Sequence, residues 1–171
     1  MRKIVLTGPE STGKTTLAKQ LAGHFGAQWV PEYAREYLES LGRKYVQDDL
    51  IEIAKGQIAK ENFFAQGNSR FILCDTSLEV IQIWSKVVFG NCAPWITEQL
   101  KMRQPDLYLL CQPDLPWAPD PLRENPNDRD VLYTIYQQEL AALGTDFIQI
   151  NGIGNERFDK AAAKIEKFIN L

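Results

Sequence analysis

The 171-residue chain carries a net charge of −3; apolar residues make up 44% of it and charged residues 24%. This mix is typical of a soluble globular protein, and the acidic balance excludes an overall basic field that would attract nucleic acid or an anionic membrane. The sequence contains no signal-peptide pattern and no apolar run near the roughly 18 residues of a membrane span. We therefore expect one cytoplasmic domain over residues 1–171. No pattern indicates its oligomeric state.

Apolar runs alternate with helical patterns along the chain. Strands are predicted over residues 3–7, 28–30, 71–74, 107–111 and 147–150. Apolar residues at helical spacing predict helices over residues 14–24 and 33–41, around 50–58, and after residues 76, 132 and 158. Thr76 followed by Glu79 forms the capping-box pattern expected where a helix starts. The alternation predicts a three-layer α/β domain with a parallel sheet of about five strands and helices on both faces.

The first predicted strand runs into a glycine-rich motif. Residues 8–15, Gly-Pro-Glu-Ser-Thr-Gly-Lys-Thr, match the P-loop pattern G-x-x-x-x-G-K-[ST] in full, with a strand before it and a helix after it. In such a loop the backbone N–H groups and the positive helix end face a phosphate. We expect ATP and Mg²⁺ here, with Lys14 on the β- and γ-phosphates and Thr15 on the metal. The predicted nucleotide-binding residues are Gly8, Glu10, Ser11, Thr12, Gly13, Lys14, Thr15 and Thr16.

Two acidic residues follow predicted strands, at the edge where ligands of open α/β sheets bind. Asp75 ends one strand and is predicted to hold Mg²⁺ or to serve catalysis, the alternative being a helix cap beside Thr76. Glu32 follows Pro31 and is placed to accept the proton of a substrate hydroxyl. Its alternative is an acidic residue that stabilises the first turn of a helix. Which of the two acids is the general base stays open.

Three further side chains are candidates for substrate binding. Tyr33 and Arg35 lie next to Glu32 in the sequence and could contact the same substrate; the alternatives are core packing for the tyrosine and a solvated face for the arginine. Trp84 lies in the helix after Asp75 and could stack on a flat ring, although large aromatics at helical spacing also pack in cores.

Residues 112–128 interrupt the alternation with a proline-rich stretch that has little periodicity. Such a segment in a compact domain is usually functional or mobile, and we expect a lid. Arg123 and Arg129 bracket its end. Arg123 is predicted to act on the transferring phosphoryl group and Arg129 to contact the nucleotide, the alternative for both being a solvated position.

Several strings beyond the P-loop are specific enough to suggest a family. They are Pro31-Glu-Tyr-Ala-Arg-Glu-Tyr37, Cys74-Asp-Thr76, Ile83-Trp84 and Pro119-Asp-Pro-Leu-Arg-Glu-Asn-Pro126. With these, the chain resembles the ribosylnicotinamide kinase domain at the C-terminus of the bacterial NAD-biosynthesis regulator NadR, over nearly its whole length. The resemblance implies a nucleoside-kinase fold with a lid and transfer of the ATP γ-phosphate to the 5′-hydroxyl of nicotinamide riboside. It extends to neither a helix-turn-helix nor an adenylyltransferase region, so the kinase is expected to be free-standing.

Two rival functions remain beside nicotinamide riboside kinase. One is a kinase for another nucleoside or small hydroxyl substrate, since the acceptor pocket is built from scattered side chains. The other is a P-loop ATPase or nucleotide-binding regulator, which requires a polar group that positions water. The arginine-bearing lid and Glu32 favour a closed, water-excluding kinase site over this last reading.

Overall fold

The computed structural model describes residues 1–123 and 127–170. Its first half contains β1 (Arg2–Thr7), α1 (Lys14–Phe25), β2 (Gln28–Val30), α2 (Tyr33–Leu41), α3 (Gln47–Phe64) and β3 (Phe71–Asp75). Its second half contains α4 (Leu78–Phe89), α5 (Pro94–Met102), β4 (Leu107–Cys111), α6 (Arg129–Leu143), β5 (Phe147–Ile150) and α7 (Asn155–Ile169). Among the described residues, no helix is both long and apolar enough to cross a bilayer.

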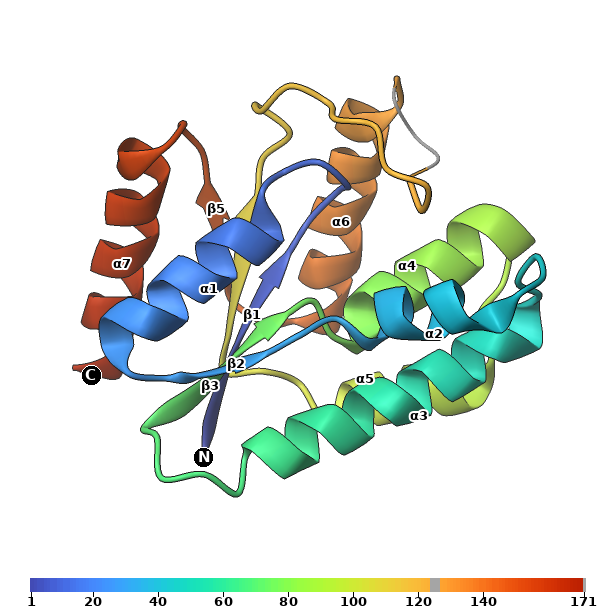
Figure 1. Ribbon diagram of the computed structural model, residues 1–171, viewed down its shortest axis with the longest axis horizontal. Helices are drawn as coiled ribbons and strands as arrows, with labels where there is room; N and C mark the ends of the chain where they lie inside the picture. The colour runs from blue at the N-terminus through green and yellow to red at the C-terminus, as the bar shows by residue number, and fades with distance from the viewer. Residues whose placement is uncertain (124–126, 171) are drawn as a thin grey trace.

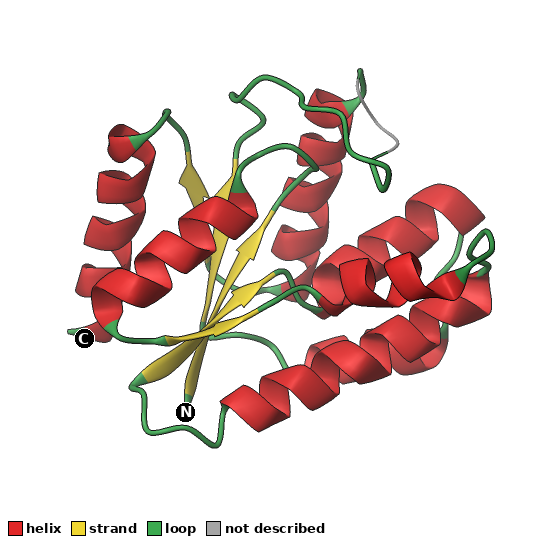
Figure 2. Ribbon diagram, viewed as in Figure 1, coloured by secondary structure: helices red, strands yellow, loops and turns green. Residues whose placement is uncertain are grey.

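The strands form one parallel sheet in the order β2-β3-β1-β4-β5. The central strands are continuous apolar runs because helices cover both of their faces. On one face α1 and α7 pack on the sheet, and on the other α4 and α6 do (Figure 1). Figure 2 shows the resulting layers of helix, strand and helix. The predicted three-layer α/β fold is confirmed.

A third apolar cluster lies beside the sheet, where α3 packs on α4 and α5 and α2 packs on α3. The helix α5 was not predicted. Its start carries Pro94 at the first position, where the missing N–H costs nothing, but no capping side chain. This group of helices carries the β2–α2 junction and the turn after β3, so it sets the walls of the site described below.

The capping box predicted at Thr76 is wrong. The helix α4 is capped by Ser77, whose side chain makes no capping bond, and Thr76 has a left-handed φ of 66°. That conformation is an outlier for a β-branched residue. The Thr76 N–H donates to the Leu6 carbonyl at 3.0 Å, which extends the β1–β3 ladder by one bond past β3. The Thr76 N–H is therefore bonded to the sheet, and the helix begins only at Leu78.

Candidate functional site

The loop between β1 and α1 curls around the start of the helix. Gly8 has a φ of 130°, and a Cβ there would lie 2.6 Å from the Cys111 carbonyl oxygen. Gly13 caps α1 with a φ of 74°, and a Cβ there would lie 2.8 Å from a methyl carbon of Leu115. Ser11 also has a left-handed φ, of 56°. Both glycines are thus required by the conformation and by the close approach of β4 and the lid.

Polar groups fix the inside of this loop. The Lys14 ammonium donates to the carbonyl oxygens of Gly8 at 2.8 Å and of Pro9 at 2.6 Å. The buried Thr12 hydroxyl donates to the Pro9 carbonyl at 2.9 Å. The loop therefore already places one positive charge, that of Lys14, at the position where its backbone N–H groups would bind an anion. Thr15 and Thr16 follow in the first turn of α1 and are exposed.

Asp75 lies opposite the loop at the end of β3 and is 3% exposed. Thr15, in the first turn of α1, is close enough to this carboxylate to act on its pKa. Burial raises the pKa of Asp75, while the Thr15 hydrogen bond and the Lys14 charge act in the opposite direction. The two positions predicted to share a metal are therefore adjacent. No group of three or more His, Cys, Asp or Glu side chains able to hold a metal occurs within residues 1–123 and 127–170.

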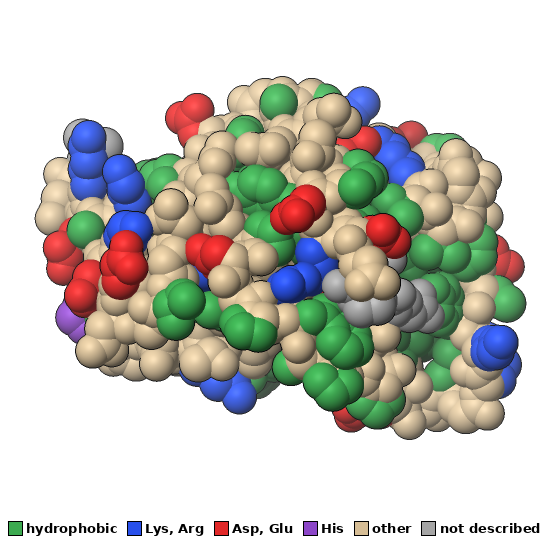
Figure 3. Space-filling view, turned by 90° about the horizontal axis from the view of Figure 1, so that it is seen from above, with side chains coloured by type: hydrophobic (Ala, Val, Ile, Leu, Met, Phe, Trp, Pro, Cys, Tyr) green, Lys and Arg blue, Asp and Glu red, His purple; other side chains and the backbone are tan. Residues whose placement is uncertain are grey.

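Glu32 lies on the next strand connection, just before α2. Its carboxylate accepts a hydrogen bond from the Thr76 hydroxyl at 3.4 Å. Burial raises the pKa of Glu32 and the nearby charge of Asp75 raises it further, whereas Lys14 and Arg35 lower it. The structure thus brings the loop lysine and both predicted acids together at the carboxyl edge of the sheet. Figure 3 shows this face, on which basic and acidic side chains lie beside one another near the centre.

The side chains that follow Glu32 are engaged with other parts of the protein. The Tyr33 ring packs so closely on α3 that a Cβ at Gly56 would lie 1.9 Å from it. The Lys60 ammonium lies 5.3 Å from the centroid of the same ring. Arg35 forms an ion pair at 3.0 Å with Asp120 of the lid segment. Tyr33 is therefore partly a packing residue, and Arg35 connects α2 to the lid.

Trp84 is half-buried in the cluster of α3, α4 and α5. Its indole N–H donates to the Tyr45 hydroxyl at 3.1 Å, and the two rings meet edge-on with centroids 4.8 Å apart. Tyr45, in the connection between α2 and α3, therefore fixes the orientation of the indole ring.

The described residues of segment 112–128, the predicted lid, contact the P-loop. The Trp117 indole N–H donates to Glu10 at 2.9 Å, and the Ala118 N–H donates to the Ser11 hydroxyl at 3.1 Å. Arg129 donates to the carbonyl oxygens of Leu115 at 2.8 Å and Ser11 at 3.3 Å. Of the predicted arginines, Arg129 therefore reaches the loop.

Arg123 donates to the Ala118 carbonyl at 2.5 Å and so bonds within the lid. The last three residues of the string Leu122-Arg-Glu-Asn-Pro126 lie outside the described residues. Sequence reasoning missed Thr76, Trp117 and Asp120 as members of this region. Thr76 and Asp120 lie in strings that suggested the family, and Trp117 is an aromatic residue in a proline-rich segment, but none of these signals indicated a role at the site.

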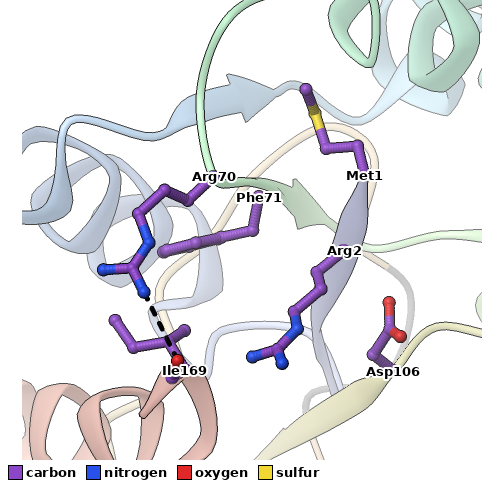
Figure 4. A pocket seen from close by; sticks show the side chains of 6 residues that line it. All are labelled: Met1, Arg2, Arg70, Phe71, Asp106 and Ile169. Atoms are coloured by element: carbon purple, nitrogen blue, oxygen red, sulfur yellow. Dashed lines mark hydrogen bonds between the residues drawn. The ribbon is translucent and has the colours of Figure 1, made fainter.

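Two surface pockets lie at opposite ends of the sheet. One, of about 520 Å³, runs along α2 and includes Glu32; its other lining residues are Pro31, Arg35, Glu36, Glu39, Ser40 and Lys60. The other, of about 510 Å³, lies at the opposite end of the sheet, where β1 and β3 begin (Figure 4). Ligands of parallel sheets bind at the carboxyl ends of the strands, so the pocket along α2 belongs to the candidate site and the pocket in Figure 4 does not.

Comparison with known proteins identifies relatives. A family model described as an AAA domain matches residues 3–157. The trifunctional NAD biosynthesis/regulator protein NadR of Escherichia coli (strain K12) is 26% identical over 156 residues, which cover 88% of this chain and 38% of that protein. NadR of Salmonella typhimurium (strain LT2) is 25% identical over 158 residues, with the same coverage. The predicted resemblance is confirmed, and the chain spans 38% of the length of these curated relatives.

Solved structures show the same fold. A crystal structure of NadR in complex with NR matches with a TM-score of 0.81 and 23% identity, covering 99% of this chain and 52% of that one. A deoxyadenosine kinase structure from M. mycoides matches with a TM-score of 0.62 and 14% identity, covering 96% of this chain and 99% of that one. Both alignments therefore cover nearly the whole chain.

Proposed function

The chain belongs to the AAA domain family, and we propose that it is an ATP-dependent phosphotransferase whose residues 1–171 act as one kinase domain. The proposed reaction transfers the γ-phosphate of ATP to the 5′-hydroxyl of nicotinamide riboside and gives nicotinamide mononucleotide and ADP. The observation that carries the proposal is the meeting of a P-loop lysine with two buried or half-buried acids, Asp75 and Glu32, at one sheet edge. The NadR relatives, named for NAD biosynthesis, support the choice of acceptor.

On the nucleotide side, the P-loop N–H groups and the start of α1 bind the phosphates. Lys14 leaves the carbonyls of Gly8 and Pro9 for the β- and γ-phosphates, where it offsets charge that builds in the transition state. Arg129 holds the lid on the loop, and Arg123 reaches the transferring group when the lid moves. Residues Glu10, Ser11, Thr12 and Thr16 complete the proposed nucleotide site.

A magnesium ion fits the pair formed by the Thr15 hydroxyl and the Asp75 carboxylate. Mg²⁺ takes few protein ligands and fills its other positions with water and substrate phosphates, so one hydroxyl and one carboxylate at the P-loop suffice. When bound, the ion supplies positive charge to the phosphate oxygens.

On the acceptor side, Glu32 is the proposed base. Its carboxylate takes the proton of the 5′-hydroxyl as that oxygen forms a bond to the γ-phosphorus and the bond to the ADP oxygen breaks. The raised pKa of Glu32, caused by burial and by Asp75, makes it a better proton acceptor than an ordinary glutamate. Tyr33 and Trp84 offer aromatic surface, and Arg35 holds the lid at Asp120 beside the acceptor.

One observation favours a second candidate, a kinase for a neutral nucleoside. The nicotinamide ring of the riboside is cationic, and Lys60 already places a positive charge 5.3 Å from the Tyr33 ring. A neutral base meets no repulsion there. A panel of nucleosides tested with Mg-ATP, with ADP release as the measurement, decides between the two. Nicotinamide riboside as the preferred acceptor supports the first candidate, a neutral nucleoside supports the second, and ADP release independent of any acceptor contradicts both.

A further inference from the structure

A buried polar cluster lies directly beneath the two acids, between α3 and the strand ends. Its members Gln57, Glu61, Thr76 and Ser77 are each less than 5% exposed. Buried polar side chains persist where hydrogen bonds satisfy them. The proposed reaction uses none of these four groups directly, so their arrangement requires another explanation.

Gln57 connects two chain segments that are remote in the sequence. Its amide oxygen accepts a hydrogen bond from the Tyr33 N–H at 2.9 Å, at the first residue of α2. Its amide nitrogen donates to the Thr76 carbonyl at 3.4 Å, in the turn after β3. One side chain from α3 therefore holds the residue after Glu32 and the residue after Asp75 at the same time.

Glu61, one turn later on α3, fixes the orientation of that amide. It accepts from the Gln57 amide nitrogen at 3.3 Å and from the Ser77 hydroxyl at 2.5 Å. The carboxylate is itself paired with Lys3 at 3.0 Å. Because a carboxylate only accepts hydrogen bonds, the nitrogen end of the Gln57 amide must face Glu61 and Thr76, which leaves the oxygen end for Tyr33.

The turn that Gln57 holds is a strained one. Thr76 has a left-handed φ of 66°, which a β-branched residue adopts only when its surroundings enforce it. In this conformation the Thr76 hydroxyl reaches Glu32 at 3.4 Å. Strain that is held by buried bonds and aims a hydroxyl at a candidate base is typical of a site organised for function.

We propose that Gln57 is a positioning residue: its buried amide clamps the start of α2 to the turn after β3 and so sets Glu32 relative to Asp75. The inference rests on the proposed function. Glu61 keeps the Gln57 amide oriented, and the hydroxyl of Thr76, whose carbonyl Gln57 holds, positions the Glu32 carboxylate. Gln57 touches neither nucleotide nor acceptor, and so acts only through the residues that it holds.

The test compares Gln57→Met with Gln82→Met. Gln82 is also buried, on α4, and its amide donates to Glu139 at 2.9 Å, away from the two acids. We expect Gln57→Met to lower kcat by about 10- to 100-fold, with little change in the Kd of ATP and with faster amide exchange at Tyr33. Gln82→Met is expected to lose similar thermal stability and to keep kcat.

If Gln57→Met does not fold, Gln57→Asn replaces it. The side chain is one methylene shorter and reaches only one of the two segments, so kcat should fall in the same way. An unchanged kcat in a folded Gln57 variant overturns the inference, whether or not its Tyr33 amide exchanges faster, and leaves the proposed function standing. Wild-type protein that phosphorylates no acceptor overturns both, so the two failures are distinguishable.

Discussion

The nucleotide side and the acceptor side of this site are built in different ways. The nucleotide side is one contiguous loop, whose glycines and lysine are set by local backbone geometry and by the start of α1. The acceptor side takes residues from β2, α2, α3, β3, α4 and the lid, held together by Gln57, by Thr76 and by the Arg35–Asp120 pair. Phosphate recognition thus depends on a short contiguous motif, whereas acceptor recognition depends on how distant segments pack.

Removing the charge of the nucleotide side should have the largest effect. Lys14→Ala is expected to reduce turnover on the order of 10²- to 10³-fold, as loss of one strong electrostatic donor does. The melting temperature should stay close to that of the wild type, because Lys14 bonds only to its own loop. Lys164→Ala, at an exposed position of α7, is the control. Near-normal turnover of Lys14→Ala would contradict the nucleotide site itself.

A buried acid next to the acceptor side makes folding stability depend on pH. Burial raises the pKa of Glu79 from 4.5 to about 7, and its Oε2 has no hydrogen-bond partner among the described residues. Between these two values the folded state keeps a proton that the unfolded state releases, so stability falls as pH rises to about 7 and is level above it. Glu79→Gln should remove this slope and gain about 3 kcal/mol at pH 8.

Urea unfolding of the wild type and of Glu79→Gln at pH 5 and pH 8 measures the effect. If the difference in unfolding free energy between the two proteins is the same at pH 5 and pH 8, Glu79 is ionised in the folded protein at both pH values, contrary to this account.

Substitutions of the two acids, Glu32 and Asp75, should produce different kinetic defects. Glu32→Gln is expected to lower kcat about 10²-fold with little change in ATP affinity, because a general base acts in the chemical step. Asp75→Asn should in addition raise the magnesium concentration needed for half-maximal activity. Magnesium titrations of kcat, with ATP affinity measured by equilibrium binding, distinguish them. A Glu32→Gln variant defective only in ATP binding would remove Glu32 from the acceptor side.

Alanine substitutions at two helix glycines, Gly56 and Gly23, form a matched pair with the smallest expected effects. A Cβ at Gly56 on α3 meets the Tyr33 ring at 1.9 Å, whereas one at Gly23 on α1 meets nothing within 4 Å. Gly56→Ala should therefore destabilise by about 1–2 kcal/mol and raise the acceptor KM, since the ring and α2 must shift. Gly23→Ala should stabilise by about 0.5–1 kcal/mol. Thermal unfolding of both variants checks the pair, and equal signs would contradict the packing described for Tyr33.

The difference between the two sides also explains what the sequence could predict. The five strands and the P-loop followed from apolar runs and from one motif, because these features are local. The helix α5 and the turn at Thr76 did not, since the first lacks a capping side chain and the second is shaped by a sheet bond to Leu6. Gln57 gave no signal at all, because a glutamine in a helix usually faces water. Tyr33, Arg35 and Trp84 stay predictions as substrate-binding residues, and their partners Lys60, Asp120 and Tyr45 could not be predicted because they come from packing.

The central claim, phosphorylation of nicotinamide riboside, is tested most directly by one comparison of kcat/KM. Nicotinamide riboside, uridine, adenosine and thymidine are measured with Mg-ATP under one set of conditions. A cationic ring gains about 0.5–2 kcal/mol from an aromatic face, so nicotinamide riboside should exceed each neutral nucleoside by up to roughly 30-fold. A neutral nucleoside with the higher kcat/KM would contradict this acceptor.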